Sequence, residues 1–253
     1  MRILSHGGTD TGRKRTNNED AFLMNDGLGL YAVADGIGGT EGGEVASRIA
    51  VETLAESMPD LLGDKDRTPA AGSAADGRTE LPALRQAVAL MNRKILDAVS
   101  KNAALEGMGT TLTALLVADR RAFVAHIGDS RLYRLRSGRL GQLTNDHSVV
   151  AEQVRAGLLS AEKARSSPLR HVITRALGTS GEADPDVTEH PLQTGDTFLI
   201  CTDGLTDMVD DREIAGILAK DPPRDAVKKL IDAANEHGGA DNVTAVVVQV
   251  QEV

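Results

Sequence analysis

Short apolar runs rich in β-branched residues recur along the chain and predict β-strands. Most runs are bounded by Gly or Asp, which commonly end strands at turns. The segments "VADRRAFV" and "RLRSGRLGQL" predict two tight hairpins, the second with Gly138 at its turn. Strands joined so closely must be antiparallel. The predicted strands are Gly29–Ala34, Thr111–Ala118, Ala122–Ile127, Leu132–Leu135, Thr197–Thr202 and Val243–Val250.

A second pattern, with apolar residues three and four positions apart, predicts helices. The clearest apolar stripe runs over residues 84–99, and another runs over residues 45–54. A capping box at Asp210 begins a further helix. Asp221, before two prolines, begins the next helix, and Gly238 ends it. Helices segregated from antiparallel strands predict an α+β fold, in which a two-sheet sandwich carries helices outside.

The domain organisation follows from the breaks in these patterns. Between Gly63 and Glu80 the periodicity disappears and Ala, Gly, Asp and Arg accumulate, which predicts a mobile surface loop between two helices, with no catalytic role. There is no internal repeat and no convincing domain linker. We therefore expect residues 1–253 to form a single domain.

The composition narrows the class of protein. A hydrophobic content of 41% supports a substantial core, and the lone Cys201 cannot form an internal disulfide. No Cys and His spacing suggests zinc. Without a long apolar run or the apolar core of a signal peptide, we expect a cytoplasmic protein with no membrane association. The net charge of −9 disfavours nucleic acid as a partner, although most of it can be explained by solubility.

Aspartates stand at the ends of several predicted strands: Asp35, Asp129, Asp203 and Asp241. Each one alone is better explained as a turn or N-cap residue. Together, at one edge of a sandwich, they would raise each other's pKa values unless cations lay among them. Mg²⁺ and Mn²⁺ prefer such oxygen ligands, and water bridging two of these ions becomes a hydroxide that can attack phosphorus in line. The conjunction therefore favours a metal site.

Neighbouring residues extend this hypothesis. Glu19 and Asp20 in "NNED" add two carboxylates. The segment "DGIGGTEGG" lacks the Walker and G-x-G-x-x-G patterns, so we expect its glycines to make room for a cation, with the Gly36 carbonyl as a ligand. Arg15, four residues before Glu19, suits a bidentate clamp on a phosphoryl group, the alternative being an exposed surface arginine.

The histidines are scattered along the sequence. We expect His126 to be a core residue on its strand and His147, in "NDHS", to be a turn residue. Each of these roles is more common than that of a catalytic acid or base.

An ordered series of motifs extends the argument to a family. The motifs are "RTNNED", "ADGIGG", "GTTLTA", "GDSRLY", "LTNDHS", "ITRALG", "CTDGL" and "ADNVTAVVV". Their order resembles that of the metal-dependent protein Ser/Thr phosphatases of the PPM type, the protein phosphatase 2C family, in its bacterial form. The resemblance extends from about Ser5 to Val250. It implies a four-layer α-β-β-α sandwich with a dinuclear Mg²⁺/Mn²⁺ centre at one edge.

The resemblance also implies a reaction and partners. Such a protein hydrolyses phosphoserine and phosphothreonine on proteins and opposes bacterial Ser/Thr kinases. Phosphorylated proteins, including a kinase, would be its partners, and it would act as a monomer. Matched by motif, Asp35 would bridge both metals, Asp203 and Asp241 would complete one metal, and Glu19 and the Gly36 carbonyl would serve the other.

Further residues match supporting positions of the family. Asp20 would support the site from behind the ligands, and Arg15 would bind phosphate. Asp129 would hold a third, weaker metal that shares Asp203. The segment 149–170 matches a flap beside the active site that influences the choice of substrate.

One position departs from the eukaryotic pattern, and two rival functions have to be weighed. Many eukaryotic members carry a His where this chain has Ile37, so the proton for the leaving alkoxide would come from elsewhere, such as a water on the third metal.

A pseudophosphatase that only binds partners would lack a core ligand, and none is missing. A phosphatase of an anti-sigma pathway would usually carry an additional sensor domain, for which 253 residues leave no room.

Overall fold

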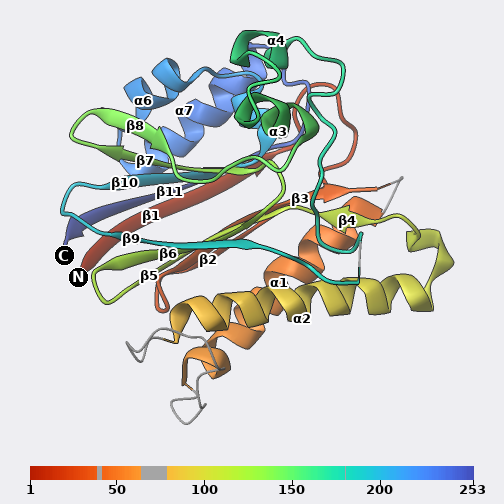
Figure 1. Ribbon diagram of the computed structural model, residues 1–253. Coiled ribbons are helices and arrows are strands. Elements are labelled where there is room, and N and C mark those ends of the chain that lie inside the picture. Colours follow the sequence, from red (N-terminus) through yellow and green to blue (C-terminus); the bar gives the residue numbers. More distant parts are fainter. Residues whose placement is uncertain (39–41, 64–78, 180) are drawn as a thin grey trace.

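Two antiparallel sheets lie face to face, with helices on both outer surfaces, in the computed structural model (Figure 1). The structure describes residues 1–38, 42–63, 79–179 and 181–253. In order across the first sheet, the strands are β1 (Arg2–Asp10), β11 (Val243–Glu252), β10 (Thr197–Cys201), β7 (Arg131–Arg136) and β8 (Arg139–Gln142). Across the second they are β2 (Asp20–Asn25), β3 (Leu30–Ile37), β5 (Leu112–Ala118), β6 (Arg121–Ile127) and β9 (Asp186–Pro191), and the short β4 (Gly109–Thr110) pairs with β3. This arrangement confirms the predicted four-layer α-β-β-α fold.

Each helical layer covers one sheet with an apolar face. The helices α1 (Gly42–Gly63) and α2 (Glu80–Lys101) pack on the second sheet, and α6 (Asp211–Leu218) and α7 (Pro223–Glu236) pack on the first (Figure 1). The predicted stripe of α2 is confirmed, since Leu84, Val88, Met91 and Ile95 are all buried. Burying a side chain of this size contributes roughly 1.5–3 kcal/mol. A third apolar cluster, which includes Phe198 and Val248, fills the space between the sheets.

The elements predicted from periodicity are present, with shifted ends. The hairpin between β5 and β6 turns at Asp119 and Arg120, which both adopt the positive φ that a tight two-residue connection requires. At α6, Asp210 is the N-cap as predicted, and its carboxylate accepts from the Glu213 amide at 2.8 Å, which is one of the two hydrogen bonds of a capping box. The N-cap of α7 is Pro222 rather than Asp221, whose carboxylate instead pairs with Lys229.

Several elements were not predicted, because their sequences carry no clear periodicity. The strand β1, "RILSHGGTD", contains two glycines and is held by pairing with β11 along its length. The edge strand β9, "DVTEHP", is mostly polar. The remaining short helices are α3 (Val149–Arg155), α4 (Ala161–Arg165), α5 (Asp203–Thr206) and the 3₁₀ turn η1 (Ala103–Leu105). The loop predicted between Gly63 and Glu80 falls on residues 64–78, which lie outside the described residues.

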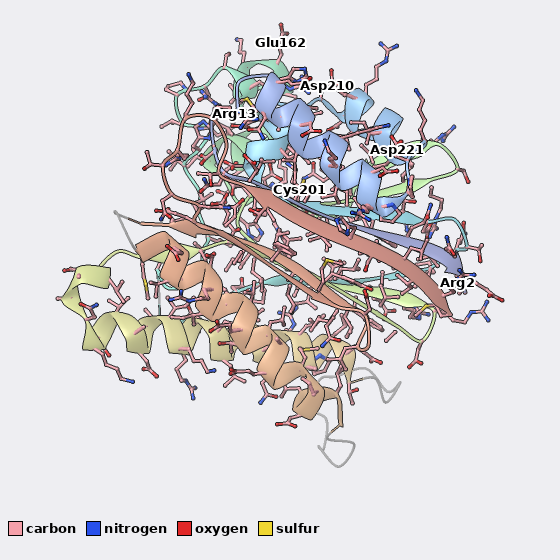
Figure 2. The ribbon with its side chains drawn as sticks, turned by 180° about the vertical axis from the view of Figure 1, so that it is seen from behind. Arg2, Arg13, Glu162, Cys201, Asp210 and Asp221 are labelled. Atoms are coloured by element: carbon pink, nitrogen blue, oxygen red, sulfur yellow. The ribbon has the colours of Figure 1, made fainter. Side chains whose placement is uncertain are left out.

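The two ends of the sandwich differ in what they carry. Both chain termini lie together at one end (Figure 1). Figure 2 shows β1 running from Arg2 at that end toward Arg13 at the other. The segment with α3 and α4 and the start of β11 also lie toward the far end (Figure 1).

None of the described helices is long and apolar enough to cross a membrane.

Candidate metal centre

The carboxylates predicted from the strand ends meet in a single cavity. Its volume is about 550 Å³, and Asp35, Asp129, Asp203 and Asp241 all line it. Arg15, Glu19 and the backbone of Gly36 line the same cavity, so segments from the two sheets contribute together. The structure therefore brings the residues that the sequence singled out together around one cavity. The cavity is also lined by residues that the sequence did not single out as site residues: Thr111, Arg170, His171, Ile173 and Asp207.

The position of Asp35 is fixed through its main chain by a threonine pair. The strand β3 does not end at Asp35, as predicted, but continues to Ile37. The Asp35 amide donates to Oγ1 of Thr111 at 3.0 Å, and the Asp35 carbonyl accepts from the Thr111 amide at 2.9 Å. Oγ1 of Thr110 donates to the same carbonyl. With its backbone held in this way, the Asp35 side chain is free to face the cavity.

Glycine is required where the backbone segments of the site approach each other. A Cβ on Gly36 would collide with the carbonyl oxygen of Gly43 and lie 2.6 Å from that of Glu19. A Cβ on Gly43 would collide with the Glu19 carboxylate. The predicted role of these glycines was to make room near a cation. The structure shows that they make room for the backbone and for Glu19 itself.

Asn242 joins the N-terminal segment to Asp241. Its Oδ1 accepts from the Glu19 amide at 2.8 Å, and its Nδ2 donates to the carbonyls of Thr11 and Asn17. On the same side, Nη2 of Arg15 lies 2.7 Å from Oδ2 of Asp241. This hydrogen bond and the charge of Asp241 raise the pKa of Arg15. Arg15 is thus half exposed but directed at the cavity, which disfavours the alternative of an unattached surface arginine.

The cavity holds more negative charge than its cations can balance. Burial and the nearby Asp20, Asp203 and Asp129 carboxylates raise the pKa of Asp35 well above its usual value. Burial, followed by the charge of Asp203, raises the pKa of Asp129 to about 8. Burial also raises the pKa of Glu19, although Arg15 opposes this shift. Unlike an isolated surface aspartate, these groups resist ionisation because they are partly or fully buried and because each has further carboxylates beside it.

Asp20 lies behind the cavity rather than on its wall. Its Oδ2 accepts from Oγ1 of Thr202 at 2.9 Å and from Oγ1 of Thr244 at 2.6 Å. Its Oδ1 is buried and has no hydrogen-bond partner among the described residues. Burial raises the pKa of Asp20 to about 7, and the two threonine hydrogen bonds oppose that shift. This position agrees with the supporting role that the resemblance implied.

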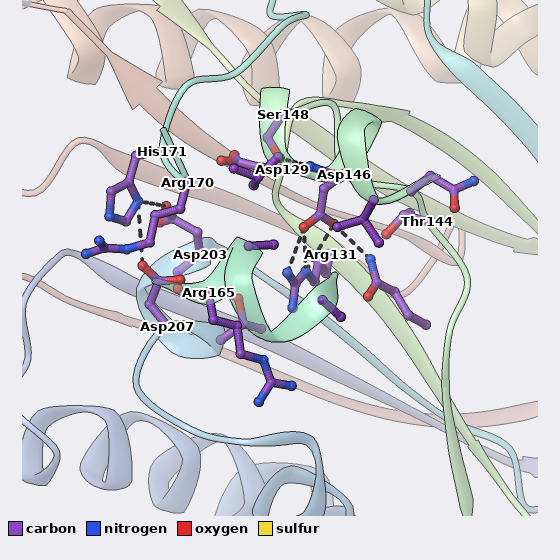
Figure 3. A pocket seen from close by; sticks show the side chains of 18 of the residues that line it. Asp129, Arg131, Thr144, Asp146, Ser148, Arg165, Arg170, His171, Asp203 and Asp207 are labelled. Carbon is purple, nitrogen blue, oxygen red and sulfur yellow. Dashed lines mark hydrogen bonds and ion pairs between the residues drawn. The ribbon is translucent and has the colours of Figure 1, made fainter. Parts of the chain in front are cut away.

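Beside Asp203, the structure adds two residues that sequence reasoning missed. Nδ1 of His171 lies 3.8 Å from Oδ2 of Asp203 and 3.6 Å from Oδ2 of Asp207 (Figure 3). The three ligand atoms lie within 4.8 Å of one another, close enough to share one cation. Asp207 stands one helical turn after Asp203 in "CTDGLTD", and this i, i+4 spacing could have drawn attention to it. His171 has no comparable signal, since its segment is irregular.

A larger groove continues from this edge of the cavity. Its volume is about 800 Å³, and Asp129, His171 and Asp203 line both this groove and the cavity that holds the carboxylates. One part of its wall comes from the segment 149–170, with Arg165 and Arg170 (Figure 3), and another part comes from the turn that follows Asp207. The predicted flap segment therefore lies beside the site.

The donor set fits hard divalent cations. It consists of carboxylates and a backbone carbonyl, which are the ligands that Mg²⁺ and Mn²⁺ prefer. Oδ1 of Asp20 is buried without a hydrogen-bond partner among the described residues, and the carboxylates of the cavity repel one another. Bound cations would relieve both conditions, which Arg15 alone does not. Ile37 also lines the cavity, so residue 37 cannot supply a proton there. The fold and the site together define a metal-dependent phosphatase.

Comparison with known proteins places the chain within that class. Residues 7–246 match the protein phosphatase 2C family. The serine/threonine phosphatase stp of Listeria monocytogenes is 38% identical over 245 residues, which cover 95% of this chain and 93% of that protein. The crystal structure of the Mycobacterium tuberculosis serine/threonine phosphatase PstP/Ppp superposes with a TM-score of 0.86 at 38% identity, covering 99% of each chain. The catalytic domain of PstP in complex with two manganese ions gives a TM-score of 0.84 at 37% identity, again covering 99% of each chain.

The chain therefore belongs to the protein phosphatase 2C family, and it is a phosphoprotein phosphatase. This confirms the resemblance drawn from the ordered motifs.

Proposed function

We propose that this protein hydrolyses phosphoserine and phosphothreonine on other proteins in a reaction that depends on Mn²⁺ or Mg²⁺. The observation that carries the proposal is the gathering of Asp35, Asp203, Asp241 and Glu19 around one cavity, with Arg15 at its rim. A cavity with such an excess of buried carboxylates is unfavourable unless cations enter it. The similarity to a relative that binds two manganese ions supports the same assignment.

Each of these side chains has a distinct task in the proposal. Asp35 would lie between two ions, with Asp203 and Asp241 on one of them and Glu19 and the Gly36 carbonyl on the other. When bound, the two ions supply a hydroxide nucleophile near neutral pH by lowering the pKa of the water between them. Asp20 orients this centre from behind.

Arg15 binds the phosphoryl oxygens of the substrate. Its guanidinium can donate two parallel hydrogen bonds to a phosphoryl group, which aligns phosphorus for in-line attack. Arg15 lies against Asp241 in this structure, so a phosphoryl group would arrive at a guanidinium already directed into the cavity.

The edge near Asp129 would take a third, weaker ion. Asp129 and Asp203 line this edge, and His171 and Asp207 lie within reach of Asp203. The segment 149–170 would act as a flap, and the groove beneath it would receive residues of the substrate that flank the phosphorylated position. Arg165 and Arg170 make that wall of the groove positively charged.

In the cell, we infer that the protein opposes Ser/Thr kinases, and that a kinase itself is among its substrates. The relatives named as serine/threonine phosphatases support substrates of this kind. We further expect residues 1–253 to act as one domain and as a monomer, without nucleic acid or membrane partners. A cytoplasmic location stays a prediction from the sequence.

Hydrolysis of p-nitrophenyl phosphate and of a phosphothreonine peptide, with Mn²⁺ or with EDTA, tests the proposal. Both substrates should be hydrolysed with Mn²⁺ and left intact with EDTA. The control is Asp35→Asn, which should stay folded and be inactive with Mn²⁺. Full hydrolysis in EDTA, or none by folded wild-type protein with Mn²⁺, would overturn the assignment.

A further inference from the structure

His147 is a buried histidine that is not among the predicted metal ligands. It is hydrogen-bonded to Gly128, in the turn that carries Asp129. Nδ1 of His147 accepts a hydrogen bond from the Gly128 amide at 3.2 Å. The His147 amide donates in return to the Gly128 carbonyl at 2.7 Å. His147 is only 2% exposed, so water does not replace these bonds. The sequence predicted a simple turn residue at this position, whereas the ring and main chain of His147 both hold Gly128.

His147 also lies at the base of the flap segment. Its carbonyl accepts from the Thr174 amide at 2.7 Å, and the Val149 amide donates to the Val172 carbonyl at 2.9 Å. Ser148 and Ile173 form an antiparallel bridge between these two contacts. Residues 147–149 are thus paired with residues 172–174, which follow the segment 149–170, and His147 connects this pair to Gly128.

The contacts of the ring determine where its proton lies. Because Nδ1 accepts from an amide, it carries no proton, and the neutral ring must be protonated at Nε2. Nε2 is buried and lies 3.4 Å from Oδ2 of Asp186, a carboxylate that favours a proton on that nitrogen. Burial lowers the pKa of His147, which keeps the ring neutral as this arrangement requires.

We propose that His147 is a positioning residue of the metal centre. It clamps the Gly128–Asp129 turn to both ends of the flap, so that Asp129 and His171 reach the same edge of the cavity. This inference rests on the proposed function, because it concerns the edge assigned to the third ion. Residues that orient metal ligands typically change metal affinity or activity by roughly 10–100-fold when they are removed.

Two substitutions separate this role from simple packing. In His147→Asn, Oδ1 of the amide occupies nearly the place of Nδ1 and can accept from Gly128. In His147→Gln, the longer side chain reaches toward Asp186 but offers no acceptor at the position of Nδ1. The proposal predicts that Asn preserves the function of His147 and that Gln does not, although both are polar amides.

The first measurement uses metal-free protein and no activity. Amide hydrogen exchange at Gly128 should become roughly 10-fold faster in His147→Gln and change by less than about 3-fold in His147→Asn. A control variant, Val248→Ala, removes buried volume between the sheets at a strand position that pairs with Ser5 and Phe198 rather than with this turn. It should lower the melting temperature without selectively changing exchange at Gly128.

The second measurement follows activation by Mn²⁺ with a phosphothreonine peptide. His147→Gln should need roughly 10-fold more Mn²⁺ for half-maximal kcat, with little change in KM. His147→Asn and Val248→Ala should resemble the wild type. Equal behaviour of Asn and Gln in both measurements would overturn the proposal, as would a Val248→Ala variant that reproduces the Gln result.

Failure of this inference can be distinguished from failure of the proposed function. If wild-type protein shows no Mn²⁺-dependent hydrolysis, the proposed function fails. If wild type is active and the His147 variants match it, only the positioning role fails. Should His147→Gln not fold, Asp186→Asn removes the partner charge at a half-exposed residue. Faster exchange at Gly128 in that variant would support the clamp, and unchanged exchange would refute it.

Discussion

A carboxylate stands beside each end of strand β10, and the two differ in the partners that the protein gives them. Before the strand, Asp196 is fully buried, and its two oxygens accept from Nε and Nη2 of Arg136, both at 2.6 Å. The Gln193 amide donates to it as well. After the strand, Asp203 faces Asp35 and Asp129 across a cavity, and Nδ1 of the half-exposed His171 lies 3.8 Å from its Oδ2.

The two carboxylates show how a structural aspartate, Asp196, differs from a proposed metal ligand, Asp203. At Asp196, a bidentate guanidinium satisfies the charge, so the chain itself completes the interaction. At the Asp203 end, burial and the accumulated negative charge raise the pKa values of Asp35 and Asp129. The mutations below separate the two ends by their effects on activity and on stability.

The largest effect is expected from Asp35→Ala. Turnover with Mn²⁺ should fall by roughly 1000-fold or more, since several kcal/mol of transition-state stabilisation depend on this centre. The melting temperature of the metal-free protein should stay the same or rise, because repulsion with Asp20 and Asp203 is relieved. Steady-state kinetics and thermal melting in EDTA check both parts. Near wild-type turnover at saturating Mn²⁺ would remove Asp35 from the centre.

Asp196→Ala should produce the opposite pattern. Breaking this buried pair should cost about 3 kcal/mol, near the lower end for such pairs, because the Arg136 side chain is 22% exposed and can reach water. For a chain of this size, that loss corresponds to a fall in melting temperature of about 6–12 °C. kcat should be unchanged at a temperature where the protein stays folded. A loss of activity without a loss of stability would contradict the distinction between the two ends.

Arg15→Ala should chiefly raise KM for a phosphopeptide. Hydrogen bonds to charged groups contribute about 1.5–3 kcal/mol, which corresponds to roughly 10–100-fold in KM. Arg15→Lys should restore only part of this loss, because an ammonium group cannot make the bidentate contact. Unchanged kinetics in both variants would show that Arg15 serves only its ion pair with Asp241.

Asp129→Ala should have the smallest effect of the series. Two ions should still bind tightly, while kcat and the response to added Mn²⁺ fall by several-fold, since the weaker third site is lost. If Asp129 only caps its turn, the variant would instead lose about 1 kcal/mol of stability and keep its kcat. Calorimetric titration with Mn²⁺, combined with melting and kinetics, distinguishes these outcomes.

The parts of the molecule that could be predicted share a strong local signal. Periodicity identified α2 and the buried strands, and an abrupt change from an apolar run to a carboxylate identified Asp35, Asp129 and Asp203. The resemblance to a family added the sandwich and the roles of these residues. The pattern alone did not determine which strand ends share an edge, because consecutive antiparallel strands end at opposite edges.

The parts that were missed depend on tertiary contacts. The strand β1 contains polar residues and glycines, and is defined by its pairing with β11. His171 reaches the site because an irregular segment places it beside Asp203 and Asp207, and no spacing in the sequence encodes that contact. The role of Thr111 is a hydrogen bond to the Asp35 backbone, which a hydrophobic pattern cannot reveal.

The central claim is that the carboxylate cavity is built for cations, and thermal melting against pH tests it most directly. Burial and neighbouring charge raise the pKa of Asp20 to about 7 and that of Asp129 to about 8. Over this range the folded state without metal binds more protons than the unfolded state, so its stability must fall as pH rises. Below about pH 6.5, neutral buried histidines such as His126, whose pKa burial lowers to about 4, have the opposite effect.

The decisive window is therefore pH 6.5 to about 8. In EDTA, the melting temperature should decrease steadily across this window, and saturating Mn²⁺ should raise it, with the largest increase at the upper end. The Asp35→Asn variant should show a smaller decrease in EDTA. A melting temperature in EDTA that is constant or rises across the window, together with no increase on adding Mn²⁺, would contradict the account.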